Sequence, residues 1–165
     1  MSEYLNWFEG PFTRWRNHAD GLEVEEREFQ QQDCYDAEHE YFWSFGWKKG
    51  ALPNSDELSL IEVSAFLDKI QKYAWFKRKF QRGKHRPTQP ITLKTHNGST
   101  SYGCWGTGEI DLSFHSNQKK FQKWIVVHEL AHVLTPHSAG GAHGRYFARV
   151  YLELVRHVYG EKHAK

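Results

Sequence analysis

The spacing of apolar residues predicts three helices beyond residue 55. After Ser59 the apolar residues recur at intervals of three and four, and Glu62 follows at the spacing of a capping box. The expected core face of this helix is Val63, Phe66, Leu67, Ile70, Tyr73 and Ala74. A second helix, residues 121–134, is apolar on nearly all sides and ends before Pro136. A third covers about residues 145–159, and its expected buried stripe is Phe147, Val150, Leu154, Val155 and Val158.

Two short segments alternate between apolar and polar residues and are predicted to be strands. ITLKTH (residues 91–96) is followed by Asn97-Gly98, a turn signal that favours a hairpin. GEIDLSF (residues 108–114) should place Ile110, Leu112 and Phe114 on one face and Glu109, Asp111 and Ser113 on the other. We expect both strands in one small mixed or antiparallel sheet. The glycines between them, at positions 103, 106 and 108, allow close turns or a bulge.

The order of these elements, with a small sheet between helices, predicts the α+β class. At 165 residues, with 39% hydrophobic and 16% aromatic content, the chain has material for one core, so we expect a single domain over residues 1–165. Residues 1–55 would be an N-terminal extension, with a helix within 23–43 and a loop over 44–55. Residues 56–160 would form the catalytic core.

Charge and composition exclude several classes of function. The formal net charge is only +2, so general binding to nucleic acids or anionic membranes is not expected. No apolar run approaches the roughly 18 residues of a membrane span, and no signal peptide is apparent. Cys34 and Cys104 are far apart in the sequence, which favours reduced thiols. Reduced thiols are typical of the cytoplasm, which is the expected location.

One local exception is the basic run KRKFQRGKHR, residues 77–86. We favour a solvated helix end and loop as its explanation. The alternative is a weak nucleic-acid contact through Lys77, Arg78, Lys79 and Arg82.

The residues with the strongest chemical signal interrupt the second helix, in VVHELAHVL (residues 126–134). His128 and His132 are four residues apart, so their imidazoles lie one turn apart on one helix face and can bind one metal ion. Zinc suits this arrangement, and Glu129 is placed to take a proton from a zinc-bound water. Hydrogen-bonded core histidines are the alternative. We favour metal, because unpaired polar groups in so apolar a helix would be costly.

A catalytic zinc site needs a third protein ligand. The metzincin pattern fails, because Thr135 and Ser138 occupy the positions of its glycine and histidine. His143 is favoured, since the glycine-rich loop before it lets the chain double back. Glu153 and His137 remain alternatives, the former at a place similar to the downstream glutamate of thermolysin-like enzymes.

VVHELAHVL followed by HGRYF (residues 143–147) resembles the pattern of SprT-like zinc metallopeptidases. The chain is most similar to a group of small, poorly characterised metallohydrolases from bacteria and their phages, which also have counterparts of EVSAFLDKIQKYAWF (62–76) and SYGCWGTGEIDLSF (101–114). The resemblance covers about residues 59–158. It implies a zincin-like metallopeptidase fold, one Zn²⁺ held by His128, His132 and His143, and Glu129 as the base. The Cys-rich zinc ribbon of full SprT proteins has no counterpart here, so their DNA-linked role is not implied.

In zinc peptidases of this design, the strand before the active helix binds an extended substrate by edge pairing. The resemblance therefore implies a peptide or protein substrate along Glu109, Ile110, Asp111 and Leu112. Candidates for stabilising the transition state are Tyr146, Arg145, His115 and His137. An equally good explanation is that Tyr146 and Arg145 are ordinary surface residues in the first turn of a helix.

The leading hypothesis is a zinc-dependent peptidase. The alternatives are a nucleic-acid-associated module with a structural metal and a hydrolase of non-peptide amides or esters. The sequence leaves the oligomeric state open.

Overall fold

The computed structural model describes residues 56–81, 87, 89–114, 120–136 and 143–160. The expected helix at 23–43 and loop at 44–55 lie outside these residues. The chain divides into two compact units, one of residues 54–136 and one of 1–53 with 137–165. In the described residues, four strands follow one another between two pairs of helices, which fits the segregated elements of the α+β class.

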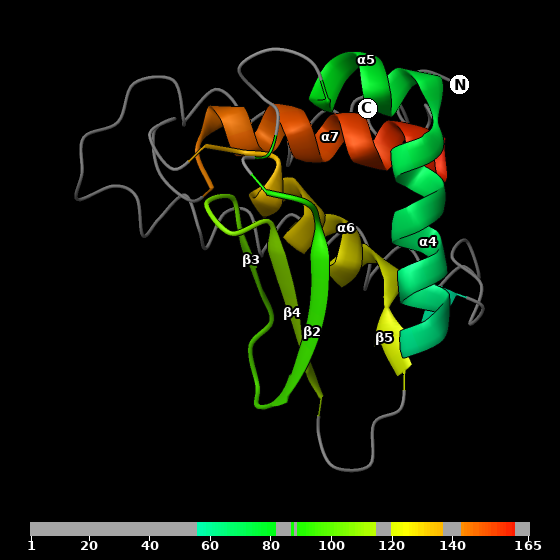
Figure 1. Ribbon diagram of the computed structural model, residues 1–165, viewed down its shortest axis with the longest axis vertical. Coiled ribbons are helices and arrows are strands. Elements are labelled where there is room, and N and C mark those ends of the chain that lie inside the picture. Colours follow the sequence, from blue (N-terminus) through cyan, green and yellow to red (C-terminus); the bar gives the residue numbers. More distant parts are fainter. Residues whose placement is uncertain (1–55, 82–86, 88, 115–119, 137–142, 161–165) are drawn as a thin grey trace, which may run out of the picture. The chain divides into compact units, whose positions relative to one another are not determined.

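A two-stranded ribbon anchors two helices of the 54–136 unit. β1 (Glu57–Ser59) pairs antiparallel with β5 (Lys120–Gln122), and Phe121 in β5 is buried. α4 (Leu60–Lys72) leaves directly from β1, and α6 (Lys123–Val133) leaves directly from β5. Figure 1 shows β5 beside the end at which α4 begins. The expected helix start at residue 121 is therefore wrong by two residues, because Phe121 fits a helical period but is used in the ribbon.

α4 begins with the predicted capping box. The Ser59 side chain accepts a hydrogen bond from the Glu62 N–H, and a Glu62 carboxylate oxygen accepts one from the Ser59 N–H at 2.8 Å. These bonds satisfy two backbone donors that a helix start leaves open. The predicted buried face is confirmed for Val63, Leu67 and Ile70.

The helix does not continue to Ala74 as the apolar spacing predicted. Tyr73 has an extended backbone (ψ 140°) and is followed by a second helix, α5 (Ala74–Phe80). A continuous helix would carry the buried stripe on to Lys77 and Arg78. The break instead buries Phe76 and Phe80 and leaves Tyr73 exposed.

A three-stranded mixed sheet stands beside α6, and β4 lies in its middle (Figure 1). β2 (Thr92–Asn97) pairs parallel with β4 (Glu109–Phe114), and β3 (Tyr102–Cys104) pairs antiparallel with β4. Ile110 and Leu112 are fully buried as predicted, but Asp111 between them is buried as well and Phe114 is half-buried, so burial does not alternate along this strand.

The structure corrects the hairpin expected at Asn97-Gly98. β2 and β3 lie on opposite sides of β4 and do not pair with each other. The strand that pairs with β2 is β4, which the chain reaches after a turn at Gly108. The backbone of Gly108 has φ +71°, and a Cβ there would lie 2.5 Å from the Pro90 carbonyl oxygen, so only glycine fits.

α6 is buried on almost every side, and its buried residues are Val126, Val127, His128, Glu129, Leu130, Ala131 and Val133.

In the other unit, α7 (Arg145–Tyr159) has the predicted bounds and buries Phe147, Val150, Leu154 and Val155 of the expected stripe. Val158 is only half-buried. None of the helices in the described parts of the chain has the length and apolar character needed to cross a membrane.

Candidate metal centre

Two imidazoles face each other across one turn of α6. The Nε2 atoms of His128 and His132 are 3.1 Å apart, and their ring centroids are 4.8 Å apart. His128 is buried with 4% exposure, and His132 is half-buried. The predicted meeting of these two side chains is therefore confirmed.

The separation of these nitrogens suits a shared metal ion. Zn–N bonds of about 2.0–2.1 Å in tetrahedral geometry place two ligand nitrogens about 3.3–3.4 Å apart. The observed 3.1 Å is close to that value. An imidazole–imidazole hydrogen bond would also give such a distance, so the pair alone does not identify a metal site.

A third histidine completes a possible ligand set. His143 precedes α7 directly, with Gly144 as the N-cap residue, and its ring packs edge-on against Phe147 at 4.8 Å. Ligand nitrogens of His128, His132 and His143 lie within 4.8 Å of one another. His143 is 6% exposed. This buried group of three histidines could hold a metal ion.

Glu129 stands next to His128 on the same helix and is 6% exposed. Successive residues of an α-helix are about 100° apart, so its carboxylate leaves the helix beside the imidazole pair rather than between the two rings. Glu129 therefore places a carboxylate, which can accept a proton, beside the two imidazoles.

Contacts at two places hold the backbone of α6 around this group. At its C-terminal end, the Thr135 hydroxyl donates to the Ala131 carbonyl at 2.8 Å, and the Thr135 N–H donates to the His132 carbonyl. On its flank, β3 comes so close that a Cβ on Gly103 would lie 2.1 Å from the Glu129 carbonyl oxygen and 3.0 Å from the His132 Cβ. The backbone that carries the two imidazoles is thus held by a strand as well as by its own cap.

Gly103 was expected in a turn or bulge, and the structure corrects this by placing it within β3. Only a residue without a side chain allows the strand backbone to lie against the helix backbone there. Its importance could have been suspected, because glycine within a strand often marks a close backbone approach. Nothing in the sequence, however, identifies α6 as the element that it touches.

The other candidate residues have varied placements. Glu153 lies in α7, where Arg156 and His157 each contact its carboxylate at 3.2 Å. Tyr146 is half-buried in the first turn of α7, and Arg145 is the first residue of that helix. His115, His137 and Arg82 lie outside the described residues.

The expected substrate strand needs correction. Glu109, Ile110 and Asp111 pair with β3 on one side, and the whole of β4 pairs with β2 on the other. Leu112 therefore belongs to a central strand as well. Its hydrogen-bonding edges are in use, so residues 109–112 do not offer a free edge to a peptide. The antiparallel edge strand of this sheet is β3.

Asp111 joins all three strands of the sheet. Its carboxylate accepts a hydrogen bond from His96 Nδ1 in β2 and one from the Tyr102 hydroxyl in β3, each at 2.8 Å. Burial alone would raise the pKa of Asp111, but the two hydrogen bonds and the charges of His96 and Lys94 outweigh it and leave the pKa below its usual value. The same contact with Asp111 raises the pKa of Tyr102.

The basic segment lies partly within the described residues. Lys77, Arg78 and Lys79 are exposed in α5, opposite the buried Phe76 and Phe80. Their exposure fits a solvated helix face and equally leaves the side chains accessible to a nucleic acid.

No protein-family model, curated protein or solved structure matches the chain.

Proposed function

We propose that the chain is a zinc-dependent metallopeptidase with a zincin-like fold, in which His128, His132 and His143 hold one Zn²⁺ and Glu129 is the general base. The observation that carries the proposal is the group of three histidines whose ligand nitrogens lie within 4.8 Å of one another, with Glu129 in the same helix turn. Nitrogen donors in this number are typical of catalytic zinc.

The size of the ligand set supports a catalytic metal over a structural one. Structural zinc sites normally close with four protein ligands, whereas catalytic sites use three and keep one position open. Within the described part of the chain, the group has three members, all histidines. This favours hydrolysis over the alternative of a structural metal in a nucleic-acid module.

Glu129 would act as the proton acceptor. When bound, zinc lowers the pKa of water to about 7 and polarises a carbonyl group. The Glu129 carboxylate takes the proton from the attacking water and can return it to the leaving amine. Burial of Glu129 keeps competing solvent away from that carboxylate. Tyr146, in the first turn of α7, is the candidate donor to the developing oxyanion, and Arg145 is the alternative.

The arrangement of the sheet supports a peptide substrate. β3 is an edge strand, and its backbone lies against the backbone of α6 at Gly103 and Glu129. An extended peptide that pairs with β3 would run beside the histidine pair, so edge pairing moves from β4, where the sequence placed it, to β3. Small amides and esters need no such strand.

The decisive experiment is Glu129→Gln in the full chain, assayed with a fluorescence-quenched peptide library. The amide keeps the size of the side chain but cannot accept the proton, so hydrolysis should fall about 10²–10⁴-fold while one zinc ion per chain is retained. Glu153→Gln is the matched control and should leave the rate unchanged. A Glu129→Gln protein that cleaves peptides at the wild-type rate would rule out this mechanism. Cleavage of p-nitrophenyl esters but of no peptide would assign the site to non-peptide substrates.

A further inference from the structure

Positive charge is concentrated in one stretch of the chain, and the small net charge does not reveal this. Between Asp68 and Glu109 the sequence has no acidic residue and nine Lys or Arg. The rest of the chain then carries 13 Lys or Arg against 20 Asp or Glu. The net charge of +2 therefore conceals a strongly basic segment.

Five of these cations lie on α4 and α5 and are exposed: Lys69, Lys72, Lys77, Arg78 and Lys79. We call them the α4–α5 basic face. At a rise of 1.5 Å per residue, each lies within about 10 Å of Tyr73 along the helix axes. This is close to the Debye length of about 8–10 Å at physiological salt, so the charges act jointly on a ligand.

Most of this charge has no counter-ion among the residues that the structure describes. Lys69, Lys72, Lys77 and Arg78 form no ion pair with any residue in the described ranges. Three other cations of the described chain, Lys94, Lys123 and Arg156, do pair with carboxylates. The side chains of Lys69, Lys72, Lys77 and Arg78 are exposed and can contact an external polyanion.

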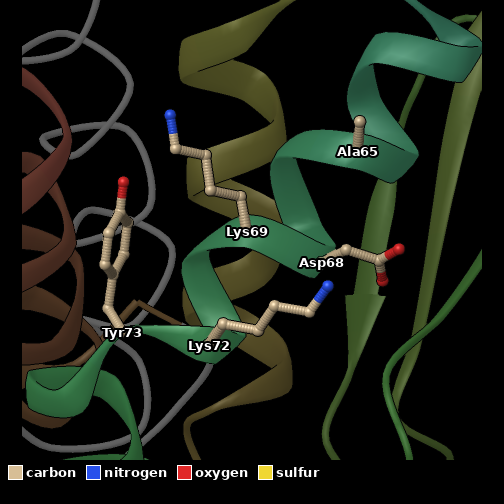
Figure 2. A pocket seen from close by; sticks show the side chains of 5 residues that line it. All are labelled: Ala65, Asp68, Lys69, Lys72 and Tyr73. Atoms are coloured by element: carbon tan, nitrogen blue, oxygen red, sulfur yellow. The ribbon is translucent and has the colours of Figure 1, made fainter.

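A hollow on the basic face adds an aromatic ring to these charges. It has a volume of about 390 Å³ and is lined by Ala65, Asp68, Lys69, Lys72 and Tyr73. In Figure 2 the side chain of Lys69, in the last turn of α4, and that of Tyr73, the residue after α4, extend in the same direction. Tyr73 is 44% exposed and stacks on Trp75 with an interplanar angle of 21°. The ring is therefore held by a neighbour and still has accessible surface.

We propose that the α4–α5 basic face binds single-stranded nucleic acid, with phosphates at the lysines and Arg78 and one base stacked on Tyr73. Cations along a backbone track, with aromatic rings for bases, are the means by which proteins bind single strands without sequence preference. The one carboxylate of the hollow, Asp68, can accept a hydrogen bond from a base amino group. This inference is independent of hydrolysis at the histidine group.

Two other polyanionic partners fit the structure less well. The apolar faces of α4 and α5 are buried through Val63, Leu67, Ile70, Phe76 and Phe80. They cannot insert into a lipid surface, as an interfacial helix would. An acidic protein segment would neutralise the lysines but would place no base on the exposed surface of the Tyr73 ring.

The test is fluorescence anisotropy of a labelled 20-nucleotide single strand with the full-length Glu129→Gln protein. If about four phosphates are contacted, log affinity should fall with log salt at a slope of about −2.8, which is about 50-fold between 50 and 200 mM salt. The double variant Lys72→Gln/Lys77→Gln should bind at least tenfold more weakly, and its slope should be smaller by about 1.4.

The control is Lys120→Gln/Arg149→Gln, which removes the same charge from two exposed positions elsewhere. It should stay within twofold of the parent protein. Tyr73→Phe should keep the affinity and Tyr73→Ala should lose it, because stacking needs the ring and not the hydroxyl.

Three results would overturn the proposal. Equal losses in the two double variants would show a general charge effect. Displacement of the strand by polyglutamate at the same charge concentration would show a site for any acidic polymer. Binding to phosphatidylserine vesicles but to no oligonucleotide would assign the face to membranes.

Discussion

Gly103 of β3 lies against the Glu129 carbonyl of α6, so that a Cβ at position 103 would come within 2.1 Å of that oxygen. Real side chains do not tolerate such a distance, and the obstacle is backbone on both sides. The strand and the helix that carries the histidine pair are therefore fitted to each other at one residue. The nearest side-chain atom that this Cβ would meet is the His132 Cβ, at 3.0 Å.

We expect Gly103→Ala to lower the free energy of unfolding by about 1–3 kcal/mol, as overpacking in a core does. It should also weaken zinc binding, because the helix must move to make room for the methyl group. Urea unfolding of the metal-free protein and zinc titration measure the two effects.

Gly106→Ala is the matched control, since a Cβ at that position would meet nothing within 4 Å. It should change the free energy of unfolding by no more than about 1 kcal/mol and leave zinc affinity unchanged. If the two variants behave alike, the close approach of β3 to α6 does not position the site.

The capping box at the start of α4 gives a second prediction. Ser59→Ala removes the hydroxyl that accepts from the Glu62 N–H, which should cost about 1 kcal/mol of stability. Ser64→Ala changes the same residue type in an exposed position within the helix and should be neutral or slightly stabilising. Thermal unfolding of both variants checks this. A Ser59→Ala protein as stable as Ser64→Ala would mean that the cap contributes nothing.

Local signals in the sequence predicted much of this fold. The capping box, the extent of α7 and the burial of Val63, Leu67 and Ile70 on α4 depend on residues within a few positions of each other, and these predictions are confirmed. The pairing of His128 with His132 is of the same kind, since both lie on one turn of α6.

The features that the sequence did not predict depend on residues far apart in the chain. Asn97-Gly98 correctly marks a change of direction, but which strand lies beside β2 is decided by pairing with β4. Phe121 fits a helix, yet its strand is completed by β1, about 60 residues earlier in the chain. The role of Gly103 depends on a helix that follows it. Periodicity contains no information about such partners.

The Asp111 cluster gives a prediction for acid pH. Because the folded state holds the pKa of Asp111 below the unfolded value, the carboxylate contributes stability at neutral pH. That contribution decreases as the pH falls below the unfolded pKa of about 4 and is lost as it passes the folded pKa. Asp111→Asn should therefore cost about 2 kcal/mol at pH 7, and less at low pH, where the wild type is also protonated.

Urea unfolding between pH 7 and pH 3 measures this difference. Asp68→Asn is the control, because the Asp68 side chain is exposed and forms no ion pair within the described part of the chain. Its curve should run parallel to that of the wild type. A constant difference between Asp111→Asn and the wild type over the whole range would contradict the assignment.

The third ligand can be identified by a pair of variants. Zinc at 100 times its dissociation constant should raise the free energy of unfolding of the wild type by about 2.7 kcal/mol, and chelation with EDTA should reverse this. His143→Ala should lose most of that increase, since it removes one of three nitrogen donors. Glu153→Gln should keep it, because the Glu153 carboxylate already contacts Arg156 and His157. The opposite outcome, with zinc stabilisation lost in Glu153→Gln and kept in His143→Ala, would make Glu153 the ligand and exclude the three-histidine site.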